Sequence, residues 1–542
     1  MKKLYPLLFF LITIHLSAQQ DAWVYFKDKP NAATFLATPT SMLSQRALDR
    51  RTRYSIALNE KDAPIESSYY TQVKNATGIT LLAKSKWLNA VHVQGTQTNI
   101  NNLKNTFSFV NKIEFADKSL NAKSRDVKTV SATQKVNKFQ QTTVDYNYGN
   151  TANQTTMLKA DFLHEKGFTG SGMYIAVIDA GFPNVNTLAA FKRLRDNNQI
   201  LGGYDFVARS TNFYSGHNHG TNVLSDIGGY LDGQFIGTAP DASFYLFRTE
   251  DAANEVPLEE TLWVEAAERA DSLGVDVINT SLGYSSFFDE TRYNYKYSDM
   301  DGKTAFISRG AQVAAEKGML LVTSAGNEGN DPWKHINAPA DVSTVFTVGA
   351  VNEAGTIASF SSFGPTADNR VKPDVLAQGQ NVYIINHISG APVTSNGTSF
   401  SSPVIAGVLA CFWQAFPNLT NLQLMQRIRE SADRYNNPHE QYGYGIPNFE
   451  TAYNTVLALE NKEFLTETSI YPNPVSNTIY IHTTTANLPH LKVKIFNVLG
   501  KKVLEINNLK SKKIHVSQLT SGIYIIQLQK ENQLKTMKLI KK

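Results

Sequence analysis

The sequence is poor in the features that mark several classes of protein. Its 542 residues include a single cysteine, Cys411, so the chain can form no internal disulfide. Charged residues make up 18% of the chain and hydrophobic residues 42%, which excludes an intrinsically disordered protein. The net charge of +5 is small for this length and does not indicate a nucleic-acid-binding protein. Beyond the first 18 residues no apolar run reaches the length that spans a bilayer, so we expect no transmembrane segment.

Residues 1–18 have the pattern of a secretory signal peptide. Lys2 and Lys3 supply the positive start, residues 4–16 are mostly apolar, and Ser17-Ala18 offers a small-residue cleavage site. The apolar run is too short for a stable membrane-spanning helix. We therefore expect the mature protein to leave the cytoplasm and to be secreted or held at the cell surface.

The next part, residues 19–117, has the pattern of a small α+β domain. The expected strands are residues 22–26, 86–93 and 109–115, and the expected helices are residues 41–53 and 99–105. Residues 118–154 are rich in Ser, Thr, Asn, Gln and Lys, which predicts an exposed linker that proteases can reach.

Residues 155–458 alternate apolar, β-rich runs with helical patterns. This alternation is typical of an α/β domain with a mostly parallel sheet and helices on both faces. Ligand sites in such a sheet lie at the carboxyl ends of the strands. The expected strands are residues 174–178, 244–247, 275–278, 319–322 and 345–348, and the expected helices include residues 258–273 and 304–317.

Residues 465–542 contain short alternating strands and almost no helical pattern, which predicts a small all-β sandwich. The expected strands include residues 491–496, 503–506 and 522–528. From residue 461 onward the chain carries 13 Lys and 4 Glu, a net charge of +9. This basic end can be a patch for a polyanion or the solvated face of a small domain, and we favour the second interpretation.

The stretch Asn396–Pro403 delivers one serine, Ser399, to the start of an apolar helix. The first amides of a helix have no intrahelical partner and can bind an anion. We expect Pro403 to fix the helix start near residues 400–402, because proline resists a helix that runs in from upstream. The alternative role of Ser399 is an ordinary helix cap. Cys411 has apolar neighbours and is interpreted as buried filling.

Three further polar residues lie at strand ends or helix starts of the same domain. Asp179 ends the strand 174–178, His219 precedes Gly220-Thr221 at a helix start, and Asn327 follows the strand 319–322. Each has an ordinary alternative: Asp179 and Asn327 can be turn residues. His217 and His219 can suggest a metal site, but residues two apart do not share a helical face.

Together these residues supply what amide hydrolysis requires. Ser399 is a candidate nucleophile, His219 a candidate base and Asp179 a candidate acid that orients the base. The side-chain amide of Asn327 and the backbone N–H of Ser399 are candidate donors to an oxyanion.

The same residues stand in motifs that resemble the subtilisin-like serine proteases, the subtilases. The resemblance covers residues 155–458, in the order Asp, His, Ser, and implies a secreted endopeptidase. It implies that Ser281, Leu282 and Gly283 pair with the substrate, and that Asn327 binds the oxyanion. The motifs are residues 167–181, His219-Gly220-Thr221 with residues 237–240, residues 276–283, Ser324-Ala325-Gly326-Asn327, and residues 396–403. The resemblance also implies that Ser324, Ala325 and Gly326 form a wall of the pocket that binds the substrate residue preceding the cleaved bond.

The sequence departs from the family pattern outside the four catalytic groups. Ala180 stands where a hydroxyl residue is usual, Asn222 stands where a second histidine is usual, and residues 400–402 differ from the common pattern. No cofactor is expected. Structural calcium is possible but unsupported, because the calcium-binding loop of subtilisin is absent and Asp299 and Asp301 are more typical of solvated loop acids.

The flanking regions also resemble parts of secreted proteases. Residues 19–117 are similar in position to subtilase propeptides, which assist folding and block the cleft. Tyr471-Pro472-Asn473-Pro474, Gly522-Ile523-Tyr524 and residues 537–542 resemble the sorting domain of type IX secretion cargo. The expected partners are protein or peptide substrates, the type IX machinery and the chain's own propeptide, and we expect a monomer.

Two other functions stay open at this stage. A catalytically inactive subtilase could serve as a surface binding or adhesion protein, although the four catalytic groups are all present. A serine esterase of the α/β-hydrolase class would need Gly-x-Ser-x-Gly and the order Ser, acid, His, whereas Ser399 comes last.

Overall fold

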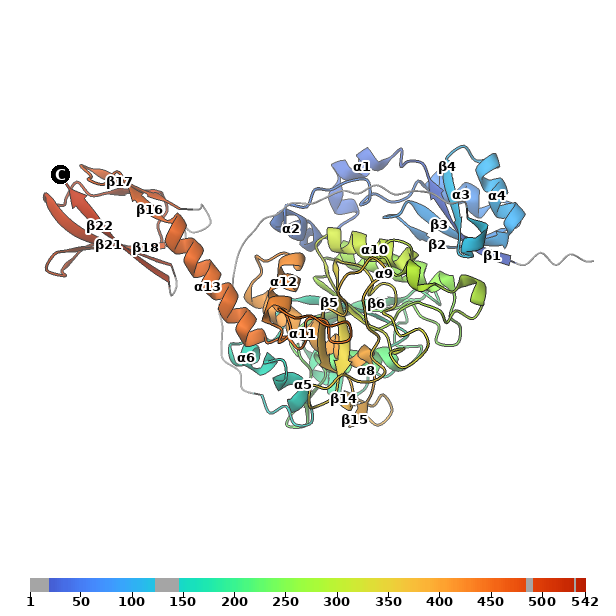
Figure 1. Ribbon diagram of the computed structural model, residues 1–542. Helices are drawn as coiled ribbons and strands as arrows, with labels where there is room; N and C mark the ends of the chain where they lie inside the picture. Colours follow the sequence, from blue (N-terminus) through green and yellow to red (C-terminus); the bar gives the residue numbers. More distant parts are fainter. Residues whose placement is uncertain (1–18, 122–145, 484–490, 531–532) are drawn as a thin grey trace, which may run out of the picture. The chain divides into compact units, whose positions relative to one another are not determined.

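The computed structural model describes residues 19–121, 146–483, 491–530 and 533–542, with the backbone only for residues 460–467 (Figure 1). The predicted signal peptide, residues 1–18, and most of the predicted linker lie outside the described residues. The chain divides into two compact units, residues 1–449 and 450–542. Among the described residues, none of the helices has the length and apolar character needed to cross a membrane.

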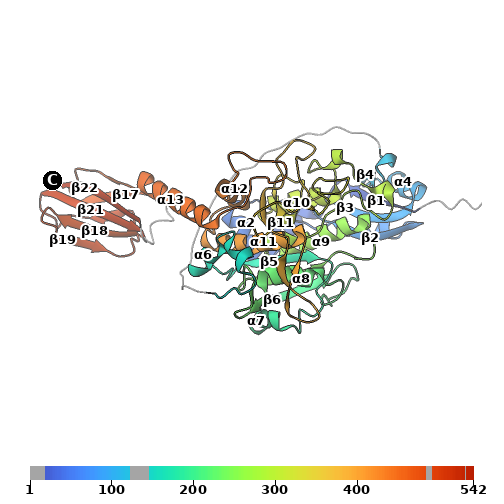
Figure 2. The same ribbon diagram turned by 60° about the horizontal axis from the view of Figure 1, so that its bottom comes forward.

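The first unit is built around a seven-stranded sheet in the order β13-β12-β11-β10-β5-β9-β6, with every neighbouring pair parallel. Helices α9 and α10 cover one face of this sheet, and α8 and α11 cover the other (Figures 1 and 2). The predicted α/β architecture is therefore confirmed. The strands are β5 (Tyr174–Asp179), β6 (Ile200–Asp205), β9 (Ser243–Arg248), β10 (Val277–Thr280), β11 (Leu320–Ser324), β12 (Val345–Val351) and β13 (Val375–Gln378).

The helices that cover the sheet are α8 (His219–Gly228), α9 (Pro257–Leu273), α10 (Phe306–Glu316) and α11 (Thr398–Ala415). Smaller elements complete the unit: α5 (Ala152–Thr156), α6 (Ala160–Glu165), α7 (Lys192–Asp196), α12 (Asn421–Ser431), β7 (Tyr230–Leu231), β8 (Phe235–Ile236), β14 (Val382–Ile385) and β15 (Pro392–Ser395). The central strands are apolar and fully buried because helices cover both of their sides. Helix α11 is buried around almost its whole circumference. Cys411 lies in this helix and is buried in the core, as predicted.

The N-terminal region forms a four-stranded antiparallel sheet in the order β2-β3-β1-β4. Helices α3 and α4 pack on one face, while the other face lies on α9 and α10, where the Trp23 ring stacks on Phe306 at 4.7 Å. The elements are β1 (Gln19–Phe26), α1 (Ala32–Ala37), α2 (Gln45–Arg53), α3 (Ser67–Lys74), β2 (Ile79–Ser85), β3 (Ala90–Thr96), α4 (Gln97–Thr106) and β4 (Val110–Phe115).

Two expectations for this part of the chain were wrong. Residues 86–93 are not one strand: β2 ends at Ser85, a turn with Asn89 at φ 49° follows, and β3 begins at Ala90. Residues 146–154 do not belong to an exposed linker. Thr151 and Gln154 are buried, and the Gln154 amide donates to Asp226 and to the Tyr383 carbonyl, so this segment is part of the packed domain.

The second unit is all-β apart from α13 (Phe449–Glu467), by which the chain enters it. Its two sheets have the orders β16-β17-β20 and β19-β18-β21-β22 and enclose one apolar core, as predicted. The Asn473 side chain bonds to the Lys538 carbonyl and the Ile540 N–H of the last strand, which ties two of the predicted sorting motifs together. The strands are β16 (Ser469–Tyr471), β17 (Thr478–His482), β18 (Leu491–Asn497), β19 (Lys502–Ile506), β20 (Lys513–His515), β21 (Gly522–Lys530) and β22 (Gln533–Lys541).

Candidate active site

The predicted site residues gather at the carboxyl edge of the parallel sheet, where ligands bind in such folds. Asp179 is the last residue of β5, Ser281 follows β10 directly, and Asn327 comes three residues after β11. His219 is the first residue of α8, and Ser399 is the second residue of α11. Residues that are up to 220 positions apart in the sequence thus meet at one edge.

Asp179 and His219 are joined by a hydrogen bond of 2.8 Å between Oδ1 and Nδ1. The backbone N–H of Ala180 donates to the same carboxylate oxygen, and the Asp179 side chain is 1% exposed. Among the described residues, Asp179 Oδ2 has no hydrogen-bond partner, which fits the absence of a hydroxyl at Ala180. Burial lowers the pKa of His219, but the Asp179 carboxylate and the more distant Glu250 outweigh it, so this pKa lies above its ordinary value.

Gly220 allows the close approach of α8 to Asp179. A side chain at this position would place its Cβ 2.5 Å from the Gly181 carbonyl oxygen and 2.9 Å from the Asp179 Cβ. Residues larger than glycine would therefore push the first turn of α8 away from β5 and lengthen the Asp179–His219 bond.

Ser399 is buried and exchanges hydrogen bonds with Ser281. Its Oγ donates to the Ser281 carbonyl (3.2 Å), and the Ser281 Oγ donates to the Ser399 carbonyl (2.9 Å). Asn279 donates to the Ser281 Oγ (3.1 Å) and holds it in place. In the described part of the chain, Ser399 Oγ forms no hydrogen bond with His219. The next residue in the chain, Phe400, does lie beside His219, with the two ring centroids 5.7 Å apart.

The predicted start of α11 was wrong. The helix begins at Thr398, and Pro403 lies inside it rather than at its first turn. Proline at this position removes the N–H that would bond to the Ser399 carbonyl, four residues earlier. The Ser281 Oγ replaces that donor, so the helix can start two residues earlier than the local rule predicts.

Asn327 is exposed, and the start of α11 sets its orientation. Its Oδ1 accepts hydrogen bonds from the Thr398 N–H (2.8 Å) and from the Thr398 Oγ1 (3.0 Å). A backbone N–H can only donate, so this contact fixes which end of the amide is the oxygen. The Asn327 NH2 is left to donate elsewhere. The Asn327 N–H donates to Glu328, which also accepts from Asn337 and Ser362 and anchors this loop.

The residues predicted to contact the substrate flank Ser399 on two sides. Leu282 and Gly283 are half-exposed, and their backbone groups form none of the backbone hydrogen bonds found among the described residues. On the other side Ser324, Ala325 and Gly326 continue from β11, with the Gly326 N–H bonded to Thr398 Oγ1 (3.2 Å). A segment with unpaired backbone groups therefore directly follows Ser281, the residue that contacts the predicted nucleophile.

Glu250 is a residue of this site that the sequence did not reveal. It follows β9, the strand next to β5, and it accepts a hydrogen bond from the buried Tyr284, the residue after Gly283. Burial and the nearby Asp179 charge raise the pKa of Glu250 to about 7. The sequence does show that Glu250 follows a buried parallel strand, which is a common position for a site residue. Only the strand order, however, places it next to Asp179.

Two neighbouring carboxylates share this environment. Oxygen atoms of Glu250, Glu255 and Glu259 lie within 4.8 Å of one another. Burial and mutual repulsion raise the pKa of Glu255 to about 8 and that of Glu259 to about 10. Protonation of Glu255 and Glu259 at neutral pH therefore accounts for the closeness of the three side chains.

The residues considered for metal binding have protein partners. His217 Nδ1 accepts the backbone N–H of His219 (3.3 Å). Asp299 pairs with Lys118 of the N-terminal region (2.7 Å) and accepts the Lys296 N–H. Asp301 accepts the N–H groups of Lys303 and Thr304. These contacts give each of the residues a structural role, in a turn or in the contact with the N-terminal region.

Residues 170–445 match the family model of the subtilases, peptidase family S8. The chain belongs to the subtilase family. Subtilisin of Bacillus pumilus is 32% identical to this subtilase over 306 residues, which are 55% of this chain and 96% of that protein. Subtilisin NAT of Bacillus subtilis subsp. natto is 31% identical over 306 residues, 55% of this chain and 70% of that protein.

Among solved structures, MycP1 with its N-terminal propeptide removed is 26% identical to this subtilase. The match covers 56% of this chain and 96% of that chain, with a TM-score of 0.43. Residues 21–135 of the subtilase match the peptidase S8 propeptide domain of Bacteroidota. Residues 469–542 match a secretion system C-terminal sorting domain, the type IX signal for secretion and cell-surface attachment. The subtilase is thus a serine endopeptidase with a propeptide and a sorting domain.

Proposed function

We propose that this subtilase hydrolyses peptide bonds through a triad of Ser399, His219 and Asp179. Asn327 and the backbone N–H of Ser399 are proposed to form the oxyanion hole. The observation that carries the proposal is the 2.8 Å bond between Asp179 and His219 Nδ1, because it leaves Nε2 as the free nitrogen of the imidazole. That nitrogen belongs to the only residue of the proposed set that can act as a base near neutral pH.

The first step begins with a rotation of the Ser399 side chain. Its Oγ leaves the Ser281 carbonyl and turns toward His219, which takes the proton as Oγ attacks the substrate carbonyl. Asp179 remains ionised and stabilises the imidazolium. The negative charge that develops on the substrate oxygen is bound by the Asn327 NH2, whose direction is set by Thr398.

His219 then gives its proton to the leaving amine, and an acyl-enzyme on Ser399 remains. A water molecule, deprotonated by His219, attacks this ester and releases the second product. All groups that these steps require come from the chain. We therefore propose that no cofactor is needed, and that treatment with EDTA leaves the turnover of a peptide substrate unchanged.

The proposed substrate is an extended polypeptide. Leu282 and Gly283 offer unpaired backbone groups next to Ser399, so a peptide can add to them as a strand. Ser324, Ala325 and Gly326 are proposed to form the wall beside the residue before the cut. Unfolded proteins and flexible loops satisfy this requirement better than folded domains do.

The experiment that tests the function is labelling with a fluorophosphonate probe followed by peptide mapping. We expect the label on Ser399. We also expect the Ser399→Ala variant to lose both peptide cleavage and removal of its own propeptide. Absence of the label from wild-type protein would favour a catalytically inactive subtilase that serves as a surface binding protein. Hydrolysis of esters without a cut in any unfolded protein would favour an esterase.

A further inference from the structure

Helix α2 of the propeptide docks at the edge of the sheet that lies opposite the active site. It contacts the carboxyl ends of α9 and α10, which precede β10 and β11 and therefore lie at the amino edge of the sheet. Val275 at this edge and Ser281 at the other are six residues apart, about 20 Å along an extended strand. The contact is thus separate from the cleft in which a substrate would bind.

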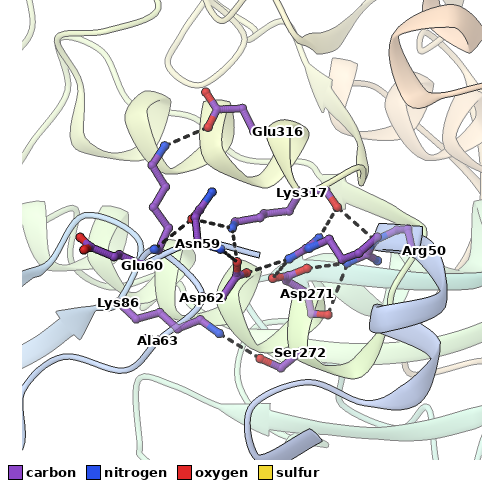
Figure 3. Close-up of polar contacts among 12 residues, drawn as sticks. Arg50, Asn59, Glu60, Asp62, Ala63, Lys86, Asp271, Ser272, Glu316 and Lys317 are labelled. Atoms are coloured by element: carbon purple, nitrogen blue, oxygen red, sulfur yellow. Dashed lines mark hydrogen bonds and ion pairs between the residues drawn. The ribbon is translucent and has the colours of Figure 1, made fainter. Parts of the chain in front are cut away.

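Two arginines of α2, Arg50 and Arg51, donate to carbonyl groups at or just beyond the ends of α9 and α10. Figure 3 shows Arg50 beside Asp271 and Lys317. Arg50 donates to the carbonyl groups of Val275, Lys317 (3.2 Å) and Asp271 (3.4 Å). Arg51 also donates to the Lys317 carbonyl. The last carbonyls of a helix have no intrahelical donor and carry partial negative charge, so guanidinium groups stabilise them well.

The same arginines belong to a buried network of charged side chains. Asp271 pairs with Arg50 through Oδ1 and with Arg51 through Oδ2 (2.8 Å). Asp62, which follows α2 in the propeptide, accepts from Arg51 (3.1 Å) and from Lys317 (2.8 Å). All five side chains are 4% exposed or less. Arg51 and Asp62 also pair with each other within the propeptide, but the ion pairs found here for Asp271 and Lys317 of the catalytic part are all with propeptide residues.

Contacts on either side of the arginines extend this docking surface. The Ser44 N–H donates to the Ser272 carbonyl (2.8 Å), and Arg46 pairs with Asp276. At the other end Tyr54 donates to the Pro417 carbonyl (3.1 Å) and packs on Trp413. Gly274 ends α9 at this point. A Cβ there would meet the Arg46 Cβ at 2.8 Å, so glycine is required for the approach of α2.

This surface differs in kind from the contact made by the propeptide sheet. The sheet meets α9 and α10 through aromatic packing, such as Trp23 on Phe306, and through the ion pair of Glu114 with Arg309. At α2, by contrast, separation would take both arginines away from the Asp271 carboxylate and from the Lys317 carbonyl. Replacing the arginines in the docked state would leave Asp271 buried without a cation, which is far more costly than losing a surface ion pair.

We propose that the amino edge of the catalytic sheet is a second docking surface for the propeptide, on which Arg50 and Arg51 hold the propeptide after the linker has been cut. Cleavage between residues 121 and 146 then leaves a two-chain complex. Release requires the loss of this contact, for example by a second cut between α2 and Asp62. The inference rests on the proposed function only in that retention would delay the appearance of the free peptidase.

The test uses the full-length Ser399→Ala chain with a recognition sequence for an unrelated protease placed between residues 121 and 146. After cutting, the catalytic part is captured through the C-terminal end, and release of the N-terminal fragment is followed over time. We expect slow release from this chain and about 100-fold faster release from the Arg50→Met, Arg51→Met double variant. Arg53→Met is the matched control, because Arg53 lies in the same helix turn but is exposed.

Near-UV circular dichroism of the uncut chains shows whether each variant folds. If the double variant does not fold, the pair Arg46→Met and Tyr54→Phe is used, which leaves the buried network intact and should still speed release about tenfold. Release of the wild-type fragment within minutes would overturn the proposal. So would release from the folded docking variants at the rate of Arg53→Met. Because Ser399 is absent throughout, these outcomes do not depend on whether the protein is an active peptidase.

Discussion

Ser281 and Ser399 exchange two hydrogen bonds, each side chain donating to the backbone carbonyl of the other residue. The pair links the end of β10 to the start of α11. It also explains how Pro403 is accommodated inside the helix, because the Ser281 hydroxyl supplies the hydrogen bond that proline cannot. The same contact holds the predicted nucleophile next to the segment that is proposed to bind substrate.

This relationship predicts a specific rescue. Ser281→Ala should lower the free energy of unfolding by about 1–2 kcal/mol, because the buried carbonyl of residue 399 loses its donor. Adding Pro403→Ala restores an N–H four residues along the helix, so the double variant should recover part of that loss. Urea unfolding in the Ser399→Ala background measures both effects. Equal losses from Ser281→Ala in the presence and absence of Pro403 would contradict this explanation.

Asn327 should act on catalysis rather than on binding. We expect Asn327→Ala to lower kcat about 100- to 1000-fold with little change in KM, because the donor acts on charge that appears in the transition state. Thr398→Val should cause a smaller loss, since it removes the hydroxyl contact to Asn327 but keeps the backbone N–H. Steady-state kinetics on a peptide substrate tests both. A change confined to KM would assign Asn327 to substrate binding.

The pH dependence of kcat/KM should report the charge of Glu250. The pKa of His219 lies above its ordinary value, and activity needs the neutral imidazole, so activity falls as the pH drops through this raised pKa. Glu250→Gln removes a negative charge that favours the imidazolium. The acid limb should therefore move to lower pH, by less than about one unit.

Neighbouring groups also influence the pKa of Glu250, so the measurement needs a control variant that keeps the carboxyl group. Burial and Asp179 raise its pKa, while the Tyr284 hydroxyl and His219 lower it, and Glu250 in turn raises the pKa of Glu255 and of Glu259. Tyr284→Phe keeps the carboxyl group and should leave an acid limb closer to that of wild type. An acid limb that stays in place in Glu250→Gln would show that Glu250 does not influence His219.

The sequence predicted those parts of the site that depend on local pattern. A buried strand that ends in Asp179 and a small-residue turn that ends in Ser399 are both visible without a structure. Features that depend on contacts between distant residues were missed. Glu250 acquires its role from strand order, β6 is obscured by two adjacent glycines, and Pro403 is tolerated only because of Ser281. Arg50 and Arg51 look like an exposed basic helix until Asp271 is placed beside them.

His164 should limit stability in acid. It is buried in α6, where Nδ1 contacts the Tyr148 hydroxyl (2.7 Å) and Nε2 contacts the Thr238 carbonyl (3.0 Å). Burial lowers its pKa to about 4, so between pH 6.5 and 4 the unfolded chain binds a proton that the folded chain does not. The contribution of His164 to the free energy of unfolding is therefore at its full value above pH 6.5. It falls by about 3 kcal/mol as the pH drops to 4.

His164→Gln removes the titrating group and should flatten this loss, although fewer contacts make the variant less stable at pH 7. Urea unfolding at pH 7 and at pH 4.5, in the Ser399→Ala background, measures the difference. His439→Gln is the matched control, because it makes the same substitution at an exposed position. If both variants lose stability in acid to the same extent as the parent chain, then His164 is not the residue responsible. The acid sensitivity would then have to come from carboxylates such as Asp62, whose lowered pKa also makes the folded state lose stability as the pH falls.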